Sequence, residues 1–256
     1  MSFSGFSTSG DVDTANGVAI QSSFQTAGGS GLSSLQNTPE WFDDFLLGSS
    51  SSGSIGELGW SLTSSGGSNG TQSEVGHPGI FSLSVYQVND TAMIRGRSFS
   101  YESFGSGITT VSYLIKLPIL SDGTDGYKVF VGYYDTSGLD VSGEGIYFTY
   151  THSENSGNWT IVTSESDASS TSADSGVAAT IDWVDLTYVV NAAATSVEFF
   201  IDGVSVGSIA TTIPTYSGGD LCSPWFGLIK TLGTSQRSIY IDAFYQKIAL
   251  TTPRFF

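Results

Sequence analysis

The chain has 256 residues, and its 8 Lys and Arg against 24 Asp and Glu give a formal net charge of −16 at pH 7. This charge repels the phosphate backbone of a nucleic acid and an anionic membrane surface, so neither is expected as a partner. The 16 Phe, 12 Tyr and 5 Trp are too many aromatic residues for a disordered chain. Together with 32 Gly and few charged residues, they disfavour helices and predict an all-β fold.

Residues 1–48 are predicted to form an extended N-terminal arm, because they are rich in Ser, Gly, Thr and Gln and show no sustained helical or alternating period. One short helical turn is expected in the arm at residues 38–47, where Thr38 can cap a helix and Pro39 suits its first position. Residues 49–256 are expected to form one β-sandwich domain.

The start of the chain has neither a basic segment nor an apolar one, so we expect no secretory signal. The sequence has no run of about 18 apolar residues, so no transmembrane helix is expected. Cys222 is the only cysteine, which excludes an intramolecular disulfide.

Alternation of apolar and polar residues predicts strands throughout the second part of the chain. The clearest strands are residues 111–117, 127–134, 145–150 and 158–162. Turns that contain Gly, such as Asp122-Gly123 and Ser156-Gly157, separate the strands about every ten residues, which is typical of a sandwich or a barrel.

The clearest hairpin spans residues 196–209, because Asp202-Gly203 supplies the positive φ angles that a two-residue turn needs. A strand at 186–191 precedes it, and a closing strand at 236–250 follows it. In this order the three segments resemble the concanavalin A-like jelly roll of lectins, glucanases and laminin-G-like domains. The resemblance covers about residues 54–250 and implies an antiparallel jelly-roll β-sandwich.

Three upstream segments, residues 43–48, 56–60 and 77–80, resemble virion proteins of tailed bacteriophages that carry this jelly roll. The resemblance implies a non-enzymatic structural virion protein, in the first place a capsid decoration (cement) protein that binds the shell through its arm. Such a protein assembles in the host cytoplasm with the major capsid protein or other virion subunits, and with itself as a dimer or trimer. The alternative is a tail fibre or spike subunit that binds host surface glycans. A secreted lectin or a glycan-active enzyme is a third class, and the choice among them is made by analogy.

The spacing of the acidic residues does not support a catalytic role for them. Glucanases of this fold need several carboxylates on one strand, in the pattern Glu-x-Asp-x-x-Glu. The nearest pair, Glu198 and Asp202, has a different spacing and ends at a turn. The two histidines, His77 and His152, are interpreted as structural or solvent-exposed side chains. We therefore predict no enzymatic activity and no catalytic residue.

A calcium ion is the one cofactor that the sequence leaves open. The segment Asp122-Gly123-Thr124-Asp125-Gly126 offers two carboxylates to a hard cation, but an ordinary polar turn is the favoured interpretation. We therefore predict no cofactor and no metal ligand.

Two sets of aromatic residues are predicted to make contacts. Glycan binding needs exposed aromatic side chains beside polar groups at a loop rim, whereas Trp60 and Trp183 are interpreted as core residues. The possible glycan contacts are Tyr134, Trp159 and Trp225. The predicted assembly contacts lie in the arm and at the C-terminus, and they are Phe3, Phe6, Phe24, Trp41, Phe42, Phe45, Phe255 and Phe256.

Overall fold

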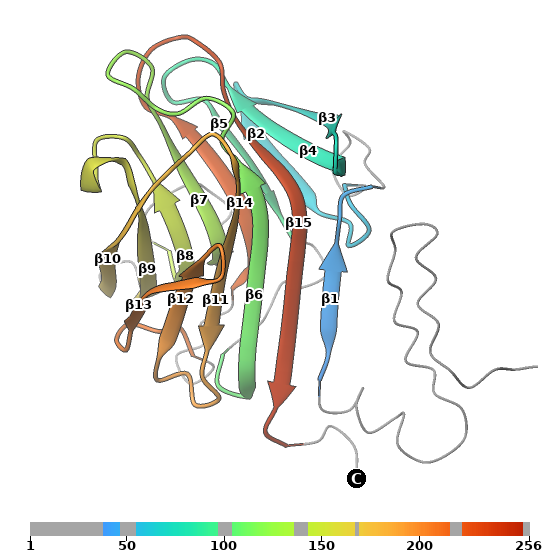
Figure 1. Cartoon of the computed structure of the whole chain (residues 1–256), viewed down its shortest axis with the longest axis vertical. Coiled ribbons are helices and arrows are strands. Elements are labelled where there is room, and N and C mark those ends of the chain that lie inside the picture. Colours follow the sequence, from blue (N-terminus) through green and yellow to red (C-terminus); the bar gives the residue numbers. More distant parts are fainter. Residues whose placement is uncertain are drawn as a thin grey trace, which may run out of the picture.

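Two antiparallel β-sheets pack face to face in the computed structural model (Figure 1). The structure describes residues 38–46, 55–96, 104–135, 143–166, 169–215 and 222–252. The all-β sandwich predicted from the sequence is confirmed, and a turn of 3-10 helix, η2 (Asn155–Gly157), interrupts the strands. No helix within the described ranges is long and apolar enough to cross a membrane.

Within the described residues, one sheet has eight strands. Seven of them follow in the spatial order β13 (Val204–Ile209), β12 (Val197–Ile201), β11 (Trp183–Val190), β6 (Gly107–Lys116), β15 (Arg237–Leu250), β4 (His77–Val85) and β3 (Ser68–Glu74). The eighth strand, β1 (Glu40–Asp43), lies beside the second half of β15 (Figure 1).

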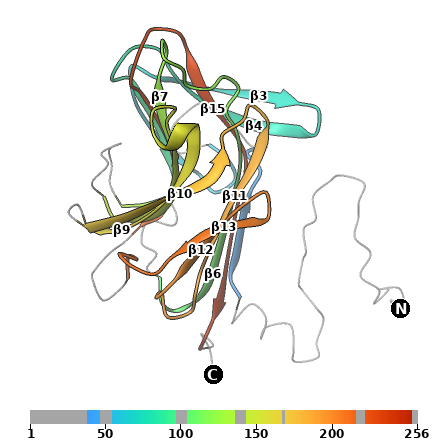
Figure 2. The same ribbon diagram turned by 60° about the vertical axis from the view of Figure 1, so that its left-hand side comes forward.

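The other sheet has seven strands in the part of the chain that the structure describes. Their spatial order is β10 (Ser169–Ala178), β9 (Asn158–Ser166), β8 (Gly145–Tyr150), β7 (Tyr127–Tyr134), β14 (Ser223–Lys230), β5 (Thr91–Arg95) and β2 (Ser61–Ser65). Turned by 60°, the molecule shows the two sheets as separate layers, with the β3–β4 hairpin projecting at one side (Figure 2).

The hydrophobic core lies between the sheets and follows the two-residue period of the strands. On β6, Val111, Tyr113 and Ile115 are buried in the core, while Ser112 and Leu114 on the opposite face are only partly buried. Successive side chains of a strand point to opposite faces, so each sheet has one face in the core and one outer face. The outer faces are therefore the surfaces on which the sequence can build a site.

The predicted hairpin is confirmed as β12 and β13. Asp202 and Gly203 both have positive φ angles, 50° and 75°, as the mirror-image two-residue turn requires. The predicted strands at residues 127–134 and 145–150 coincide with β7 and β8.

The helical turn predicted at residues 38–47 is wrong, because Glu40–Asp43 is strand β1. Trp41 packs against the core and Asp43 is buried, whereas Glu40 and Phe42 are exposed. This is the alternation of an edge strand, and pairing with β15 outweighs the capping signals of a segment too short to form a stable helix. Pro39 is tolerated immediately before such an edge strand.

Candidate functional site

The outer face of the seven-stranded sheet carries a hydrophobic cluster that is separate from the core. Gly132 of β7 lies at its centre. Phe130 and Tyr134 lie two positions away on the same strand, and Tyr147 of β8 and Trp225 of β14 are the cross-strand partners of Gly132. Four rings therefore surround one position that has no side chain. We call Phe130, Tyr134, Tyr147 and Trp225 the Gly132 cluster.

The rings of the Gly132 cluster form a closed circuit of contacts. Tyr134 and Trp225 stack with centroids 5.2 Å apart, and Tyr134 meets Tyr147 edge-on at 5.5 Å. Phe130 completes the circuit at 5.9 Å from Tyr147 and 6.0 Å from Trp225. A Cβ at position 132 would overlap the main-chain oxygen of Ile146 and the side chain of Tyr147, so this position requires glycine.

Two buried polar atoms on this face have unused hydrogen-bonding capacity. Trp225 Nε1 and Thr149 Oγ1 have no hydrogen-bond partner among the described residues. Thr149 is the cross-strand neighbour of Phe130 on one side and of Thr160 on the other. Buried polar atoms normally find a partner, so each exception requires an explanation, such as a ligand or an ordered water.

A polar fringe borders the Gly132 cluster, and we define it as Lys128, Thr149 and Thr160. Lys128 lies two residues before Phe130, with its Nζ 5.1 Å from the centroid of that ring. Thr160 Oγ1 accepts a hydrogen bond of 2.6 Å from Asn155 Nδ2. An aromatic floor with hydroxyl and ammonium groups beside it is chemically suited to a molecule with both apolar faces and hydroxyl groups.

The structure separates the three predicted glycan contacts. It brings Tyr134 and Trp225 together in the Gly132 cluster, but it places Trp159 in the core between the sheets, 5.7 Å from the ring of Tyr150. Their exposed fractions are only 2%, 2% and 1%, so the expectation of solvent-exposed rings is wrong. Alternation along a strand indicates which face a ring occupies, but whether that face is covered depends on distant parts of the chain.

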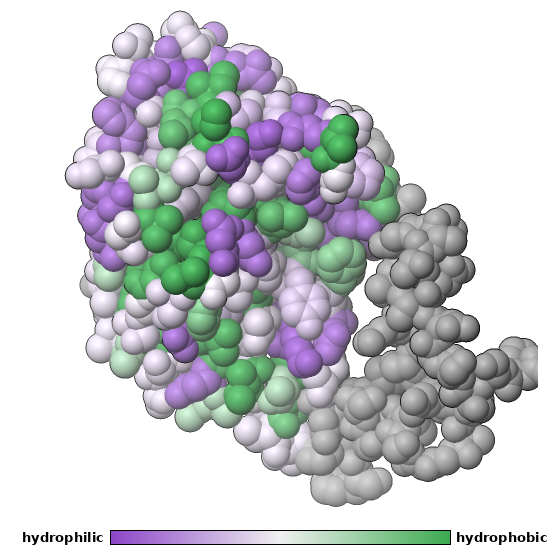
Figure 3. Space-filling model, in the orientation of Figure 1, coloured by the Kyte–Doolittle hydropathy of each residue, from purple (hydrophilic) through white to green (hydrophobic). Residues whose placement is uncertain are grey.

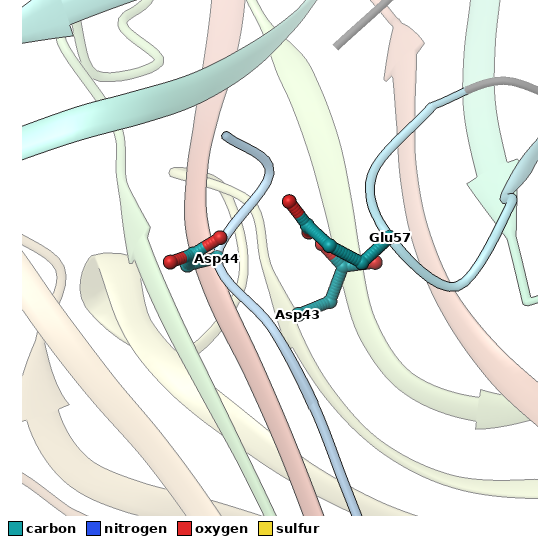
Figure 4. Close-up of side chains that lie close together, drawn as sticks. All are labelled: Asp43, Asp44 and Glu57. Carbon is teal, nitrogen blue, oxygen red and sulfur yellow. The ribbon is translucent and has the colours of Figure 1, made fainter. Parts of the chain in front are cut away.

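A second group of polar side chains is acidic. Carboxylate oxygens of Asp43, Asp44 and Glu57 lie within 4.8 Å of one another, with Glu57 reaching from the facing loop (Figure 4). Burial raises the pKa of the Asp44 carboxyl, and the nearby charge of Glu57 raises it further. The sequence analysis did not single out these carboxylates, because Asp44 and Glu57 are far apart in the chain.

Asp43 accepts hydrogen bonds from three donors of neighbouring segments. Its Oδ1 accepts a hydrogen bond from the Phe45 amide at 2.9 Å, and its Oδ2 accepts from the Leu58 amide at 2.9 Å and from Trp60 Nε1 at 2.8 Å. Three donors on a fully buried carboxylate explain its position without a bound cation. We therefore assign Asp43 a structural role.

The two carboxylates of the Asp122–Gly126 turn pair with cationic side chains of the same chain. Asp125 accepts hydrogen bonds from the Ser235 amide and the buried Lys230 ammonium, which together hold the pKa of Asp125 far below its usual range. Asp122 accepts from two amides of its own turn, which lower its pKa, and it also pairs with Arg237. These contacts favour the turn interpretation over a calcium site.

The described assembly residues differ sharply in exposure. Phe42 is 56% exposed on edge strand β1, whereas Trp41 packs partly buried against the core. Phe45 is 2% exposed and contacts the rings of Trp60 and Phe81, so it anchors its segment in the core of the sandwich. The other predicted contacts lie outside the described residues, and they are Phe3, Phe6, Phe24, Phe255 and Phe256.

Trp183 is the functional candidate that the sequence analysis missed. Trp60 is fully buried, as predicted, but Trp183 is partly exposed on the outer face of the eight-stranded sheet. It stacks on His77 with ring centroids 4.1 Å apart. On the molecular face seen in Figure 3, hydrophobic residues lie in separate patches among hydrophilic ones.

Comparisons with known proteins identify the fold. A protein of unknown function, SO2946 from Shewanella oneidensis MR-1, is 17% identical, with 91% of this chain and 98% of that chain covered and a TM-score of 0.56. Peanut lectin in complex with a peptide is 14% identical, covering 84% and 99%, with a TM-score of 0.53. The Emp47p carbohydrate recognition domain is 12% identical, covering 73% and 89%, with a TM-score of 0.50.

No protein-family model and no curated protein matches the sequence. At the identities of the solved structures, similarity shows the fold alone. The chain has the concanavalin A-like, legume-lectin-type β-sandwich, as the order of its predicted strands implied.

Proposed function

We propose that this protein is a non-catalytic carbohydrate-binding domain and that the Gly132 cluster with its polar fringe forms the saccharide site. Because the four rings are only 2–6% exposed, a saccharide reaches them only when this face of the sheet opens. The observation that carries the proposal is the unused hydrogen-bonding capacity of Trp225 Nε1 and Thr149 Oγ1 beside an aromatic floor. Two proteins of similar fold, peanut lectin and the Emp47p domain, are by name a lectin and a carbohydrate recognition domain, which supports this choice of ligand class.

The two unpartnered atoms suit saccharide hydroxyl groups. Trp225 Nε1 is a donor only, whereas a threonine hydroxyl can donate and accept. A hydroxyl group of a sugar can accept from the first and bond either way with the second. A buried donor without a partner costs about 1–3 kcal/mol, so a ligand that supplies the missing partner recovers that free energy on binding.

The charge of the chain restricts the class of saccharide. With a net charge of −16, the protein repels polyanionic glycans at long range. The one cation of the polar fringe, Lys128, already lies 3.9 Å from Glu154. The domain is therefore expected to prefer neutral saccharides.

The test removes each of the two atoms in turn: Thr149→Val replaces the hydroxyl by a methyl group of similar size, and Trp225→Phe removes the indole N–H together with part of the ring. Thr149→Val and Trp225→Phe should each weaken binding on a glycan array and in calorimetry by about tenfold or more. Because Thr149 Oγ1 has no partner in the free protein, the free energy of unfolding of Thr149→Val should stay unchanged or rise. Trp225→Phe should lower it, because the smaller ring leaves a cavity at a buried position. Thr187→Val is the matched control: it removes a hydroxyl that donates to Asp185 on the other sheet, so it should lower stability and leave saccharide binding intact.

A loss of stability in Thr149→Val with unchanged saccharide binding would mean that Thr149 Oγ1 is structural, and unchanged binding in Trp225→Phe would exclude Trp225 Nε1 from the site. Absence of binding to every neutral saccharide on the array would refute the proposed function.

We also propose that the domain is carried on a bacteriophage particle through contacts with other virion subunits. The upstream segments that resemble virion proteins motivate this proposal. It is supported by Phe42, a large apolar side chain that is 56% exposed on an edge strand directly after residues 1–37. Quantitative mass spectrometry of purified particles tests it: a copy number near that of the shell protein indicates decoration, a few copies indicate the tail, and absence refutes it.

A further inference from the structure

We infer that the outer face of the eight-stranded sheet holds a second saccharide site, centred on Trp183 and on the opposite side of the sandwich from the Gly132 cluster. This inference rests on the proposed function for the class of its ligand. It comes from a group of five partly exposed side chains that the fold gathers from five strands, and these are Glu74, His77, Lys116, Trp183 and Asp242. We call them the Trp183 surface.

Trp183 is fixed in place by contacts on several sides. Its Nε1 donates a hydrogen bond of 3.3 Å to Glu74 Oε2, and its ring stacks on His77 at an interplanar angle of 19°. Lys116, its cross-strand partner on β6, has its Nζ 5.7 Å from the ring centroid. An aromatic side chain held in one orientation loses little conformational entropy when a ligand contacts it.

Asp242 reaches this surface because of a β-bulge. The register of β15 against β6 shifts between Ile241 and Ala243, so Asp242 is the extra residue. Its Oδ2 lies 2.8 Å from His77 Nδ1. A bulge re-aims a side chain and is common beside functional sites.

The Trp183 surface retains free hydrogen-bonding positions. A carboxylate only accepts, so His77 Nδ1 donates the hydrogen of its bond to Asp242, and Nε2 on the other side of the ring is left for a ligand. Neither Nε2 of His77 nor Oδ1 of Asp242 has a partner within the described part of the chain. The side chains of Asp242, Lys116, His77 and Glu74 are 13%, 21%, 22% and 36% exposed, so a ligand can reach them.

The charges at this surface define the ligand. Glu74 and Lys116 form an ion pair at 2.8 Å, and the bond from Lys116 lowers the pKa of Glu74. Glu74, Asp242 and Lys116 together carry one net negative charge, which disfavours phosphate and sulfate. A partly exposed indole surrounded by acceptors, with a net negative charge, is suited to a neutral or amine-bearing saccharide.

The experiment observes both sites separately in the full chain. The five tryptophans are labelled with fluorotryptophan, and single Trp→Phe variants assign the fluorine NMR signals of Trp183 and Trp225. Glucose, mannose, galactose, N-acetylglucosamine, glucosamine and their oligosaccharides are then titrated. We expect at least one saccharide to shift the Trp183 signal, and Asp242→Asn to weaken that shift by about tenfold. Ile181→Ser, which changes a 55% exposed side chain two residues from Trp183, is the matched control and should leave the shift unchanged.

The outcomes separate this inference from the proposed function. Shifts of Trp225 alone, with Trp183 unaffected by every saccharide, would overturn the second site and leave the proposed function standing. Shifts of Trp183 that survive in Thr149→Val Trp225→Phe would establish an independent site. If no saccharide shifts either signal, both proposals fail. If Trp183→Phe lowers the melting temperature, Asp242→Asn still tests binding, because it changes one acceptor on the surface of a folded protein.

Discussion

Replacing Asp43 by Ala removes the acceptor that joins β1 to the loop at residues 55–60. The amide of Phe45 and Nε1 of Trp60 are buried donors that would lose their partner, and the Leu58 amide is partly buried. A buried donor without a partner costs about 1–3 kcal/mol, so Asp43→Ala should lower the free energy of unfolding by about 3–5 kcal/mol. This is a large part of the roughly 5–15 kcal/mol by which a domain is stable.

The measurement is urea unfolding followed by tryptophan fluorescence and by circular dichroism, with coincident transitions as the test of two-state behaviour. Asp43→Asn is the matched variant, because it keeps one acceptor oxygen but turns an amide NH2 toward a donor. It should lose less stability than Asp43→Ala, about 1–3 kcal/mol. A loss below about 1 kcal/mol in Asp43→Ala would refute the structural role of this carboxylate.

Four other outcomes can be measured. Gly56→Ala should destabilise the domain by about 1–3 kcal/mol in urea, because φ is +62° and a Cβ would overlap the Asp43 carboxylate. Asp125→Asn should reduce the loss in free energy of unfolding between about pH 5 and pH 2. The lowered pKa of Asp125 stabilises the folded state above the pKa that this carboxyl has in the unfolded chain, and this contribution is lost as the pH falls. An unchanged pH dependence in the variant would contradict this. Burial raises the pKa of Tyr147 to about 12, so the contribution of its protonated phenol to the free energy of unfolding should be present below about pH 10 and lost as the pH rises toward 12. Tyr147→Phe should remove one phenol that ionises at high pH from the ultraviolet titration. Phe42→Ser should change stability by less than about 0.5 kcal/mol and weaken self-association in analytical ultracentrifugation; unchanged association would exclude Phe42 from the interface.

Local patterns identified most of the strands. Residues 127–134 and 145–150 alternate and end at turns, and both became strands with these bounds. Asp202-Gly203 has the φ angles of its turn in the structure, because the chemistry of a two-residue hairpin is local. The helical turn at residues 38–47 failed because capping residues carry only a local preference, whereas the pairing partner of β1 lies about two hundred residues later in β15.

Exposure was the property that the sequence predicted least well. Tyr134, Trp159 and Trp225 were all candidates for exposed rings, yet one lies in the core and two lie in a buried cluster on the outer face of a sheet. Trp183 shares its face of β11 with Asp185 and Thr187, so the period of this strand turns it outward, and the interpretation as a core residue was wrong. The face that a strand turns inward depends on register, and one step of register exchanges the two faces.

The sequence by itself determined the all-β class, the turns and the order of strands that marks this jelly roll, because these depend on composition, period and φ angles of single residues. Only the tertiary structure decided that four aromatic rings meet around Gly132, that Asp43 receives three donors and that a bulge brings Asp242 to His77. Each of these arrangements joins strands distant in the chain, and their contacts depend on sheet order and register, which no local pattern specifies.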